Sequence, residues 1–403
     1  SLVSVIITCV ASFRVNRGAV ILAVGFCVIF VHYAIRYGYG VLLPKMLPTL
    51  GVSNLEAGII YTAYFMGYTV ATPFLGILAD KLDTRKIVAL FLALLGMGTL
   101  LLSLSNTLVE ASLSFALSGV GCAACWVPVV TIAQRWFKKK ALAVAIINVG
   151  APLGFAVDGV IMPLLIDVGG WRLGWQVFSI SSFLLAPISW FSIKSFPDDY
   201  VAKQDESASK SSLKSDLFKT IRDLKFWLIS VSYMLVGFHV MVTFTFLSKY
   251  AFEEILLPYN YATGLVSMIA VGAIPGMLAL SALSESIGRL KVLIVCGGIA
   301  IIGLLGTALL SDFLYLTISA IVYGLAYGAV WALYAALASD MFSIEHAGKV
   351  LGLMSIFYGV GCMLSPPIAG WMADITGTFR SSFVFAAVAT ALSVLCLLPT
   401  RKR

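Results

Sequence analysis

The sequence predicts an all-α membrane protein with twelve transmembrane helices in two pseudo-symmetric six-helix bundles. Three observations support this fold class. Of the 403 residues, 60% are hydrophobic and only 11% are charged, and the mean hydropathy is +1.00. A soluble domain carries about 25% charged residues, so this composition excludes a soluble enzyme. Apolar segments long enough to cross a bilayer recur along the chain, and polar patterns of the first half return in the second.

The apolar segments define twelve expected spans, six on each side of a polar linker. We expect them at residues 18–47, 55–78, 87–105, 108–133, 141–166, 174–193, 226–250, 260–283, 290–310, 313–338, 348–373 and 378–398. The longest polar stretch, 195–225, divides them. The predicted organisation is a tail at 1–17, a bundle at 18–194, the linker at 195–225, a bundle at 226–398 and a basic tail at 399–403.

The positive charges indicate an orientation in the membrane. The net charge is +8, and Lys and Arg gather in alternate loops, in the linker and at residues 401–403. Such residues favour the cytoplasmic side, so both termini are expected there, in an inner or plasma membrane. The charge then reflects topology, and no nucleic-acid partner is expected. The chain has no phosphate-binding, dinucleotide or zinc motif, so we expect no cofactor, no metal and no enzymatic activity.

The two halves repeat each other at two places. Residues 76–86 resemble residues 281–291, with Asp80 aligned to Glu285. A second repeat aligns Asp167, Gly170 and Phe178 with Asp374, Gly377 and Phe385. The two repeats have nearly the same separation in the chain, which indicates two related bundles.

The loop between the second and third expected spans carries a recognisable motif. Gly76, Asp80, Lys81, Arg85 and Lys86 resemble the loop signature of the major facilitator superfamily, with Asp83 where the family usually has Gly. The resemblance extends from about residue 18 to 398. It implies a monomeric secondary transporter that works by alternating access. It also implies a conformational lock at the cytoplasmic face, formed by Asp80, Arg85, Glu285 and Arg289. The alternative is an ordinary basic loop.

Two further segments resemble branches of this family. The segment from His32 to Arg36 is similar to the first helix of organic-anion and organophosphate transporters, where an Arg anchors the anion. The run from Gln134 to Gly154 resembles the entry to the fifth span of monocarboxylate and oxalate-type porters. These resemblances imply an organic anion as substrate.

Arg36 is the leading candidate for substrate binding. It is the only Arg or Lys expected well inside a span, where a charge costs about 2.5–3.5 kcal/mol on insertion scales. A guanidinium group can grip a carboxylate or phosphate with two parallel hydrogen bonds. The alternative is a structural Arg satisfied by helix-end carbonyls or by Asp158.

Three other ionisable residues lie within expected spans. His32 and His239 occupy equivalent places in the two halves, so we expect them to face each other across a central site. His239 is a candidate for substrate binding and for proton coupling, His32 for substrate binding, and Asp158 for proton coupling. Packing roles are the alternative for both His residues, and a solvated position near the outer end is the alternative for Asp158.

Aromatic and amide side chains complete the expected cavity wall. Tyr residues combine an apolar ring with a hydroxyl group that needs a partner, which a water-lined cavity provides. The expected substrate contacts from this group are Tyr64, Tyr68, Asn148, Tyr327, Trp331 and Tyr358.

The sequence therefore predicts a secondary active transporter of a small organic anion, a monocarboxylate or sugar acid, coupled to a proton. Three alternatives remain open at this point. One is an exchanger of organic anions, or of organophosphate for phosphate, without proton coupling. Another is a multidrug or cation exporter that relies on Asp158. The third is a sensor on the same fold that binds without transport.

Overall fold

The computed structural model describes residues 17–137, 139–196, 222–342 and 347–400, with the side chains of a few further residues, among them Asp80, left out. The expected N-terminal tail, most of the linker and the basic tail lie outside these ranges. The described residues are almost entirely helical, and none of them forms a β-strand. The all-α prediction is confirmed.

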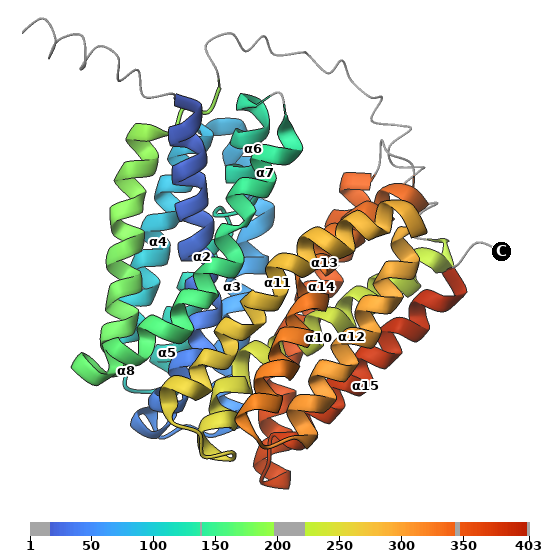
Figure 1. Ribbon diagram of the computed structural model, residues 1–403. Helices are drawn as coiled ribbons and strands as arrows, with labels where there is room; N and C mark the ends of the chain where they lie inside the picture. Colours follow the sequence, from blue (N-terminus) through green and yellow to red (C-terminus); the bar gives the residue numbers. More distant parts are fainter. Residues whose placement is uncertain (1–16, 138, 197–221, 343–346, 401–403) are drawn as a thin grey trace, which may run out of the picture.

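The first bundle contains seven helical pieces that make six spans (Figure 1). They are α2 (Arg17–Leu50), α3 (Asn54–Lys81), α4 (Thr84–Leu104), α5 (Leu108–Cys122), α6 (Val127–Trp136), α7 (Lys140–Asn148) and α8 (Gly150–Ser192). Two spans meet inside α8 at Gly169 and Gly170, where the backbone leaves helical angles. Gly170 has φ +70°, which a residue without a Cβ adopts easily.

The fourth span differs from the continuous helix that the sequence suggests. It is interrupted after Cys122, and α6 begins again at Val127. Pro128 lies in the first turn of α6, where its missing N–H group costs no helical hydrogen bond. The helix is therefore interrupted just before a proline, and a count of apolar residues in the span does not reveal this break.

The second bundle contains six helices, and its last helix ends in a short 3-10 turn. They are α10 (Leu224–Glu253), α11 (Tyr259–Ile287), α12 (Arg289–Leu309), α13 (Phe313–Met341), α14 (Ala347–Thr376) and α15 (Arg380–Leu397). Asp223 and Asp312 cap α10 and α13 by accepting hydrogen bonds from backbone N–H groups. Ten described segments are each long and apolar enough to cross a membrane. The segment that contains α8 holds two spans, which makes eleven, and α3 is the twelfth.

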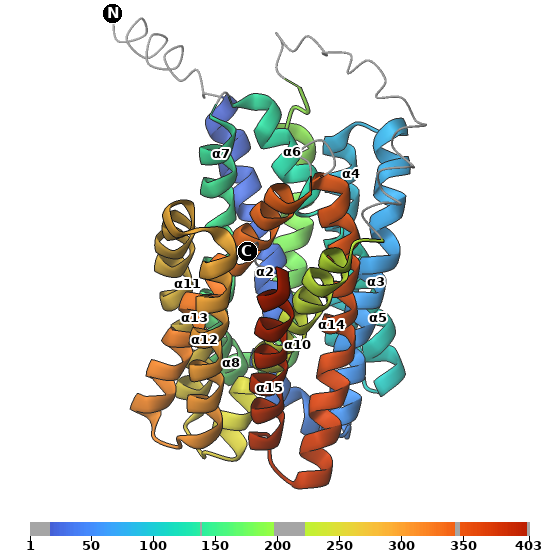
Figure 2. The same ribbon diagram turned by 90° about the vertical axis from the view of Figure 1, so that its right-hand side faces the viewer.

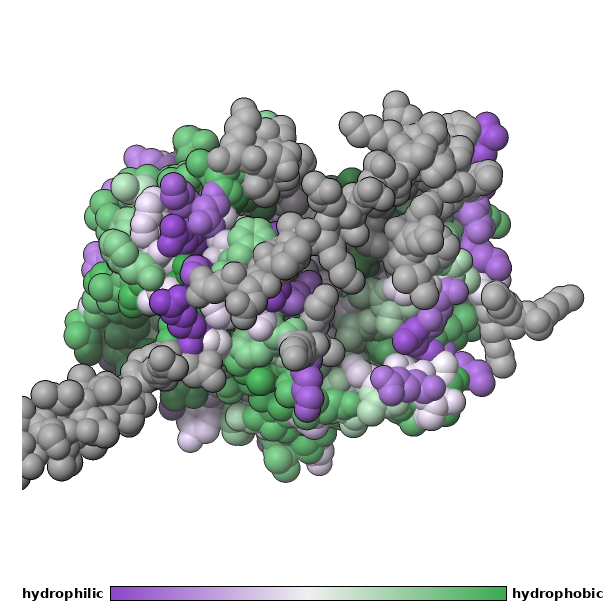
Figure 3. All heavy atoms as spheres, turned by 90° about the horizontal axis from the view of Figure 1, so that it is seen from above, coloured by the Kyte–Doolittle hydropathy of each residue, from purple (hydrophilic) through white to green (hydrophobic). Residues whose placement is uncertain are grey.

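The two bundles touch at one end of the molecule and diverge at the other (Figure 1). The view from the side shows the second bundle in front of the first (Figure 2). We call the end where α3 meets α4 and α11 meets α12 the linker face, and the opposite end the closed face. Hydrophilic residues of both bundles gather on the linker face (Figure 3).

Hydrogen bonds between the bundles lie toward the closed face. Thr62 near the start of α3 donates to Met363 O at 2.5 Å, and Ser267 donates to Ala156 O at 2.6 Å. Tyr259 donates to Val41 O at 2.6 Å. Among the described residues, no bond between the bundles is found at the linker face. The hydrogen bonds that join the bundles therefore lie toward the closed face, and the helices of the two bundles diverge toward the linker face (Figure 1).

Candidate substrate-binding site

Arg36 lies in the middle of α2, and its side chain is surrounded by aromatic rings. It is 7% exposed. Its Cζ atom lies 5.2–5.8 Å from the ring centroids of Tyr33, Tyr64, Phe65 and Tyr68. Its Nε donates a long hydrogen bond of 3.4 Å to the Tyr64 hydroxyl. The four rings attract the guanidinium group through their π faces.

Arg36 has no ion-pair partner among the described residues. Asp158, the partner that the structural alternative required, lies beside another part of α2. A Cβ placed on Gly38 would be 3.4 Å from Asp158 Oδ2. Gly38 is two residues after Arg36, or about 200° around the helix, so Asp158 and the guanidinium group lie on different sides of α2. Asp158 is 1% exposed, and its Oδ2 has no hydrogen-bonding partner.

Aromatic residues of the second bundle form the facing wall. Tyr233 stacks on Tyr334 with ring centroids 4.5 Å apart, and Tyr358 lies 4.9 Å from both Tyr233 and Trp331. A Cβ on Gly359, the residue after Tyr358, would lie 3.6 Å from Oγ1 of Thr69, the residue after Tyr68. Helices α3 and α14 therefore bring the two walls next to each other.

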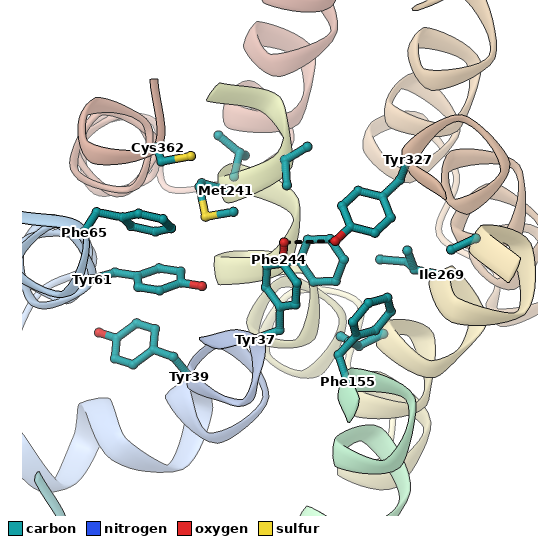
Figure 4. Packing of buried hydrophobic residues seen from close by; sticks show 14 of the residues in the cluster. Tyr37, Tyr39, Tyr61, Phe65, Phe155, Met241, Phe244, Ile269, Tyr327 and Cys362 are labelled. Carbon is teal, nitrogen blue, oxygen red and sulfur yellow. Dashed lines mark hydrogen bonds between the residues drawn. The ribbon is translucent and has the colours of Figure 1, made fainter. Parts of the chain in front are cut away.

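A cluster of rings from both bundles, the aromatic floor, packs where the two bundles meet (Figure 4). It consists of Tyr37, Phe155, Phe244 and Tyr327. The hydroxyl groups of Tyr37 and Tyr327 lie 3.0 Å apart, and Tyr37 stacks on Phe244 at 3.9 Å between centroids. All four side chains are almost completely buried. The aromatic floor begins at the residue after Arg36, because Tyr37 follows it in α2.

The two His residues do not face each other as the sequence led us to expect. His32 lies one turn from Arg36 on the same side of α2, and its buried Nδ1 has no hydrogen-bonding partner. His239 instead bonds through Nδ1 to the Tyr323 hydroxyl at 3.0 Å, inside its own bundle. It lines a cavity of about 20 Å³ with Cys296 and Ser393, between α10, α12, α13 and α15. The rotation of α10 about its axis points this side chain away from Arg36.

The remaining predicted contacts fall into two groups. Tyr64 and Tyr68 lie around Arg36, Tyr358 belongs to the facing wall, Tyr327 belongs to the aromatic floor, and Trp331 packs between Tyr327 and Tyr358. Asn148 takes another role, because its Oδ1 accepts a hydrogen bond of 3.0 Å from Trp126 Nε1. That bond ties the end of α7 to the interruption between α5 and α6.

Several residues of the site were missed in the sequence. Tyr33 precedes Arg36 by three residues, and Tyr37 follows it directly. Because residues three apart share a face of a helix, Tyr33 could have been found from helical periodicity. Phe65 and Tyr233 gave no such signal, because their proximity to Arg36 depends on contacts between helices.

The predicted lock residues pair within single bundles. Arg85 Nε lies 3.0 Å from Asp83 Oδ2, although it is not aligned as a hydrogen bond. Arg289 pairs with Asp340 at the end of α13. Glu285 is exposed, and the side chain of Asp80 lies outside the described residues. None of the described lock candidates joins the two bundles in this state, in which the bundles diverge toward the linker face.

A carboxylate joins the bundles at the closed face instead. Asp374 at the end of α14 accepts hydrogen bonds from Asn54 Nδ2 at 2.8 Å and from Leu55 N at 2.9 Å. It also accepts from Asn54 N at 3.3 Å. These backbone N–H groups begin α3, where a negative charge is favoured by the helix dipole. The sequence indicated Asp374 only as part of a repeat.

Comparisons with known proteins agree with this architecture. A family model described as Major Facilitator Superfamily matches residues 25–313 and 260–403. A relative named monocarboxylate transporter 12-B from Danio rerio is 26% identical over 364 residues, covering 81% of this chain and 75% of the relative. A probable sulfoacetate transporter from Cupriavidus necator is 21% identical, covering 96% and 94% of the two chains. A hexuronate transporter from Bacillus subtilis is 21% identical, covering 91% of each.

Solved structures show the same fold at low sequence identity. A bacterial homolog of the human lysosomal transporter Spinster, in an inward-facing and unoccupied conformation, has a TM-score of 0.78 at 16% identity over 96% of this chain and 99% of that one. The nucleoside transporter NupG also has a TM-score of 0.78, at 16% identity over 96% of this chain and 100% of that one. With the family model matching most of its length, this chain belongs to the Major Facilitator Superfamily and is a multi-pass membrane transporter, not an enzyme.

Proposed function

We propose that this transporter carries a small organic anion, a monocarboxylate or sugar acid, by alternating access. The observation that carries the proposal is the buried guanidinium group of Arg36, which has no carboxylate partner among the described residues. A charge removed from water is costly unless it is paired. The carboxylate of a substrate would supply the missing partner through two charge-assisted hydrogen bonds.

The relatives support an anionic substrate class. Three of them are named for monocarboxylates, sulfoacetate and hexuronate, which all carry at least one acidic group. Their identities of 21–26% support the class without favouring one member.

The arrangement of the bundles suggests how transport proceeds. Arg36 lies beside the aromatic floor and the bundles diverge toward the linker face, so substrate would enter or leave through the linker face in this state. By the positive-inside rule the linker face is cytoplasmic, with both termini on that side of an inner or plasma membrane. One chain carries both bundles, so a monomer suffices. The linker-face groups Asp80, Arg85, Glu285 and Arg289 would lock the opposite state.

Proton coupling is assigned to Asp158, with His239 as the second candidate. Asp158 is buried, and one of its oxygen atoms has no partner, which favours a group that exchanges a proton when water reaches it. His239 already bonds to Tyr323, but it lines a small cavity. The variants Asp158→Asn and His239→Gln should show which residue couples the proton. Loss of the coupling residue should abolish uphill uptake driven by a pH gradient and leave substrate exchange intact.

The test is transport by the purified protein in liposomes. The probes are pyruvate, glucuronate, glycerol 3-phosphate and a lipophilic cation. We expect carboxylate uptake in the wild type and its loss in Arg36→Ala, with Arg380→Ala as an Arg control at the closed face. Arg380 is exposed and its guanidinium group bonds to Ser311.

Two results would reject the proposal. One is transport of the cation alone, which would favour an exporter built around Asp158. The other is carboxylate uptake that persists in a folded Arg36→Ala protein. Uptake that depends on Arg36 but not on pH would retain the anion site and favour an exchanger without proton coupling.

A further inference from the structure

Resting on the proposed anion site, we propose that the substrate is a monocarboxylate with an aromatic or similarly flat apolar body. Three features of the surroundings of Arg36 point to this class: one positive charge, aromatic walls from both bundles, and no amide or carboxylate among the described side chains that interact with Arg36.

The charge argues for a monoanion. Arg36 is the only Lys or Arg among the described residues that lies near the aromatic floor. Lys45 lies over the rings of Phe252 and Tyr259 at the closed face, 4.5 and 5.1 Å from their centroids. Lys249 pairs with Glu253. A second acidic group on the substrate would thus be buried without a partner, which is strongly unfavourable.

The walls argue for a flat apolar body. The rings of Tyr33, Phe65 and Tyr68 lie on one side of Arg36, and those of Tyr233, Trp331 and Tyr358 form the facing wall. Aromatic rings favour offset stacking and edge contacts with another ring. Each such pair stabilises binding by about 0.5–1.5 kcal/mol beyond the contribution of the buried apolar area.

The polar groups near Arg36 are enough for one carboxylate. The buried Tyr358 hydroxyl has no hydrogen-bonding partner among the described residues. A carboxylate that bonds to both Arg36 and Tyr358 would join the two bundles through the substrate.

Among the described residues, a polyhydroxy body would find only Tyr hydroxyls and the unpaired His32 Nδ1 in the same place. The side chains that interact with Arg36 include no amide and no carboxylate. Asn148 is already bonded to Trp126. Each buried hydroxyl of a sugar acid needs its own partner, and an unsatisfied one costs about 1–3 kcal/mol.

The experiment measures binding to the purified full chain in detergent. The five probes are benzoate, cyclohexanecarboxylate, glucuronate, terephthalate and the neutral analogue benzamide, each measured by thermal shift and by isothermal titration. We expect benzoate to bind at least about tenfold more tightly than glucuronate or terephthalate, a difference of about 1.4 kcal/mol. Cyclohexanecarboxylate, whose puckered ring buries apolar area but cannot stack, should bind more weakly than benzoate. Benzamide should not bind, because it lacks the charge.

Variants connect the preference to the site. Tyr68→Leu should weaken benzoate binding about threefold to tenfold, because it removes one ring of the wall beside Arg36. Tyr315→Leu is the matched control, since Tyr315 is 54% exposed on α13. Arg36→Ala should abolish binding of every anion. If that variant does not fold, Arg36→Lys applies the same test, because Lys keeps the charge and loses the planar fork.

The outcomes distinguish this inference from the function on which it rests. Tighter binding of glucuronate or terephthalate than of benzoate, lost in Arg36→Ala, would refute the flat apolar monoanion and keep the anion site. Equal binding of benzamide and benzoate, anion binding unchanged in Arg36→Ala, or no binding of any anion would overturn both.

Discussion

The hydroxyl groups of Tyr37 and Tyr327 lie 3.0 Å apart and connect the first helix of one bundle to the fourth helix of the other. Both side chains are almost completely buried, at 1% and 5% exposed. In the proposed alternating-access cycle, this bond between the bundles breaks when they separate at the closed face. It is therefore part of the free-energy difference between the two states of the transporter.

Removing either hydroxyl should favour opening of the closed face. In Tyr37→Phe or Tyr327→Phe, the remaining hydroxyl loses its partner, which destabilises the sealed state by about 0.5–1.5 kcal/mol. The measurement is the labelling rate of a reporter, Thr263→Cys, by an impermeant thiol reagent in a background without native cysteines. Thr263 bonds across the bundles to Gly159 O at 2.9 Å. The double variant should label no faster than either single one, and additive effects would show that the two hydroxyls do not interact.

Loss of the Asp374 carboxylate should have a larger effect of the same kind. Asp374→Ala removes three hydrogen bonds to the first residues of α3, of which those to Asn54 Nδ2 and Leu55 N are the shortest. One hydrogen bond to a charged group contributes about 1.5–3 kcal/mol, so the Thr263→Cys reporter should label at least about tenfold faster. The control is Asp167→Ala at the equivalent place in the first bundle, where the carboxylate accepts no hydrogen bond from the described residues of the second bundle. Equal labelling of the two variants would contradict a role for Asp374 in closing this face.

Close backbone approach makes Gly40 sensitive to any side chain. A Cβ at Gly40 would lie 1.8 Å from the backbone oxygen of Phe244 on α10. Gly40→Ala should therefore force α2 and α10 apart at the closed face and cost about 1–3 kcal/mol in that state. Gly264→Ala is the matched control, because no atom lies within 4 Å of its added Cβ. The labelling rate of the Thr263→Cys reporter should rise for Gly40→Ala and stay at the parent level for Gly264→Ala. The reverse result would exclude close packing of α2 against α10 at Gly40.

The ion pair between Arg289 and Asp340 should contribute little to stability. The two side chains are 33% and 47% exposed, and ion pairs in such positions contribute about 0–1 kcal/mol. Arg289→Gln should thus change the melting temperature in detergent very little. If Arg289 also locks the opposite state, as proposed, the same variant should slow transport cycling. A large loss of melting temperature would indicate a structural role instead.

The sequence alone determined the fold class, the twelve spans and the single internal cation. These depend on composition, on apolar runs of bilayer length and on the alternation of basic loops, which are all local in the chain. Arg36 could be singled out because an isolated positive charge in an apolar helix is visible without knowing its neighbours. Tyr64 and Tyr68 followed from helical spacing within α3.

Only the tertiary structure decided what these residues contact. The sequence placed His32 and His239 in equivalent positions, but the rotation of α10 about its axis directs His239 to Tyr323. It placed Asp374 in a repeat, but the docking of α14 against α3 turns that carboxylate into a cap of the opposite bundle. Periodicity sets which residues share a face of one helix; which face meets a neighbouring helix is set by side-chain packing across the whole interface, and that is not a local property of the sequence.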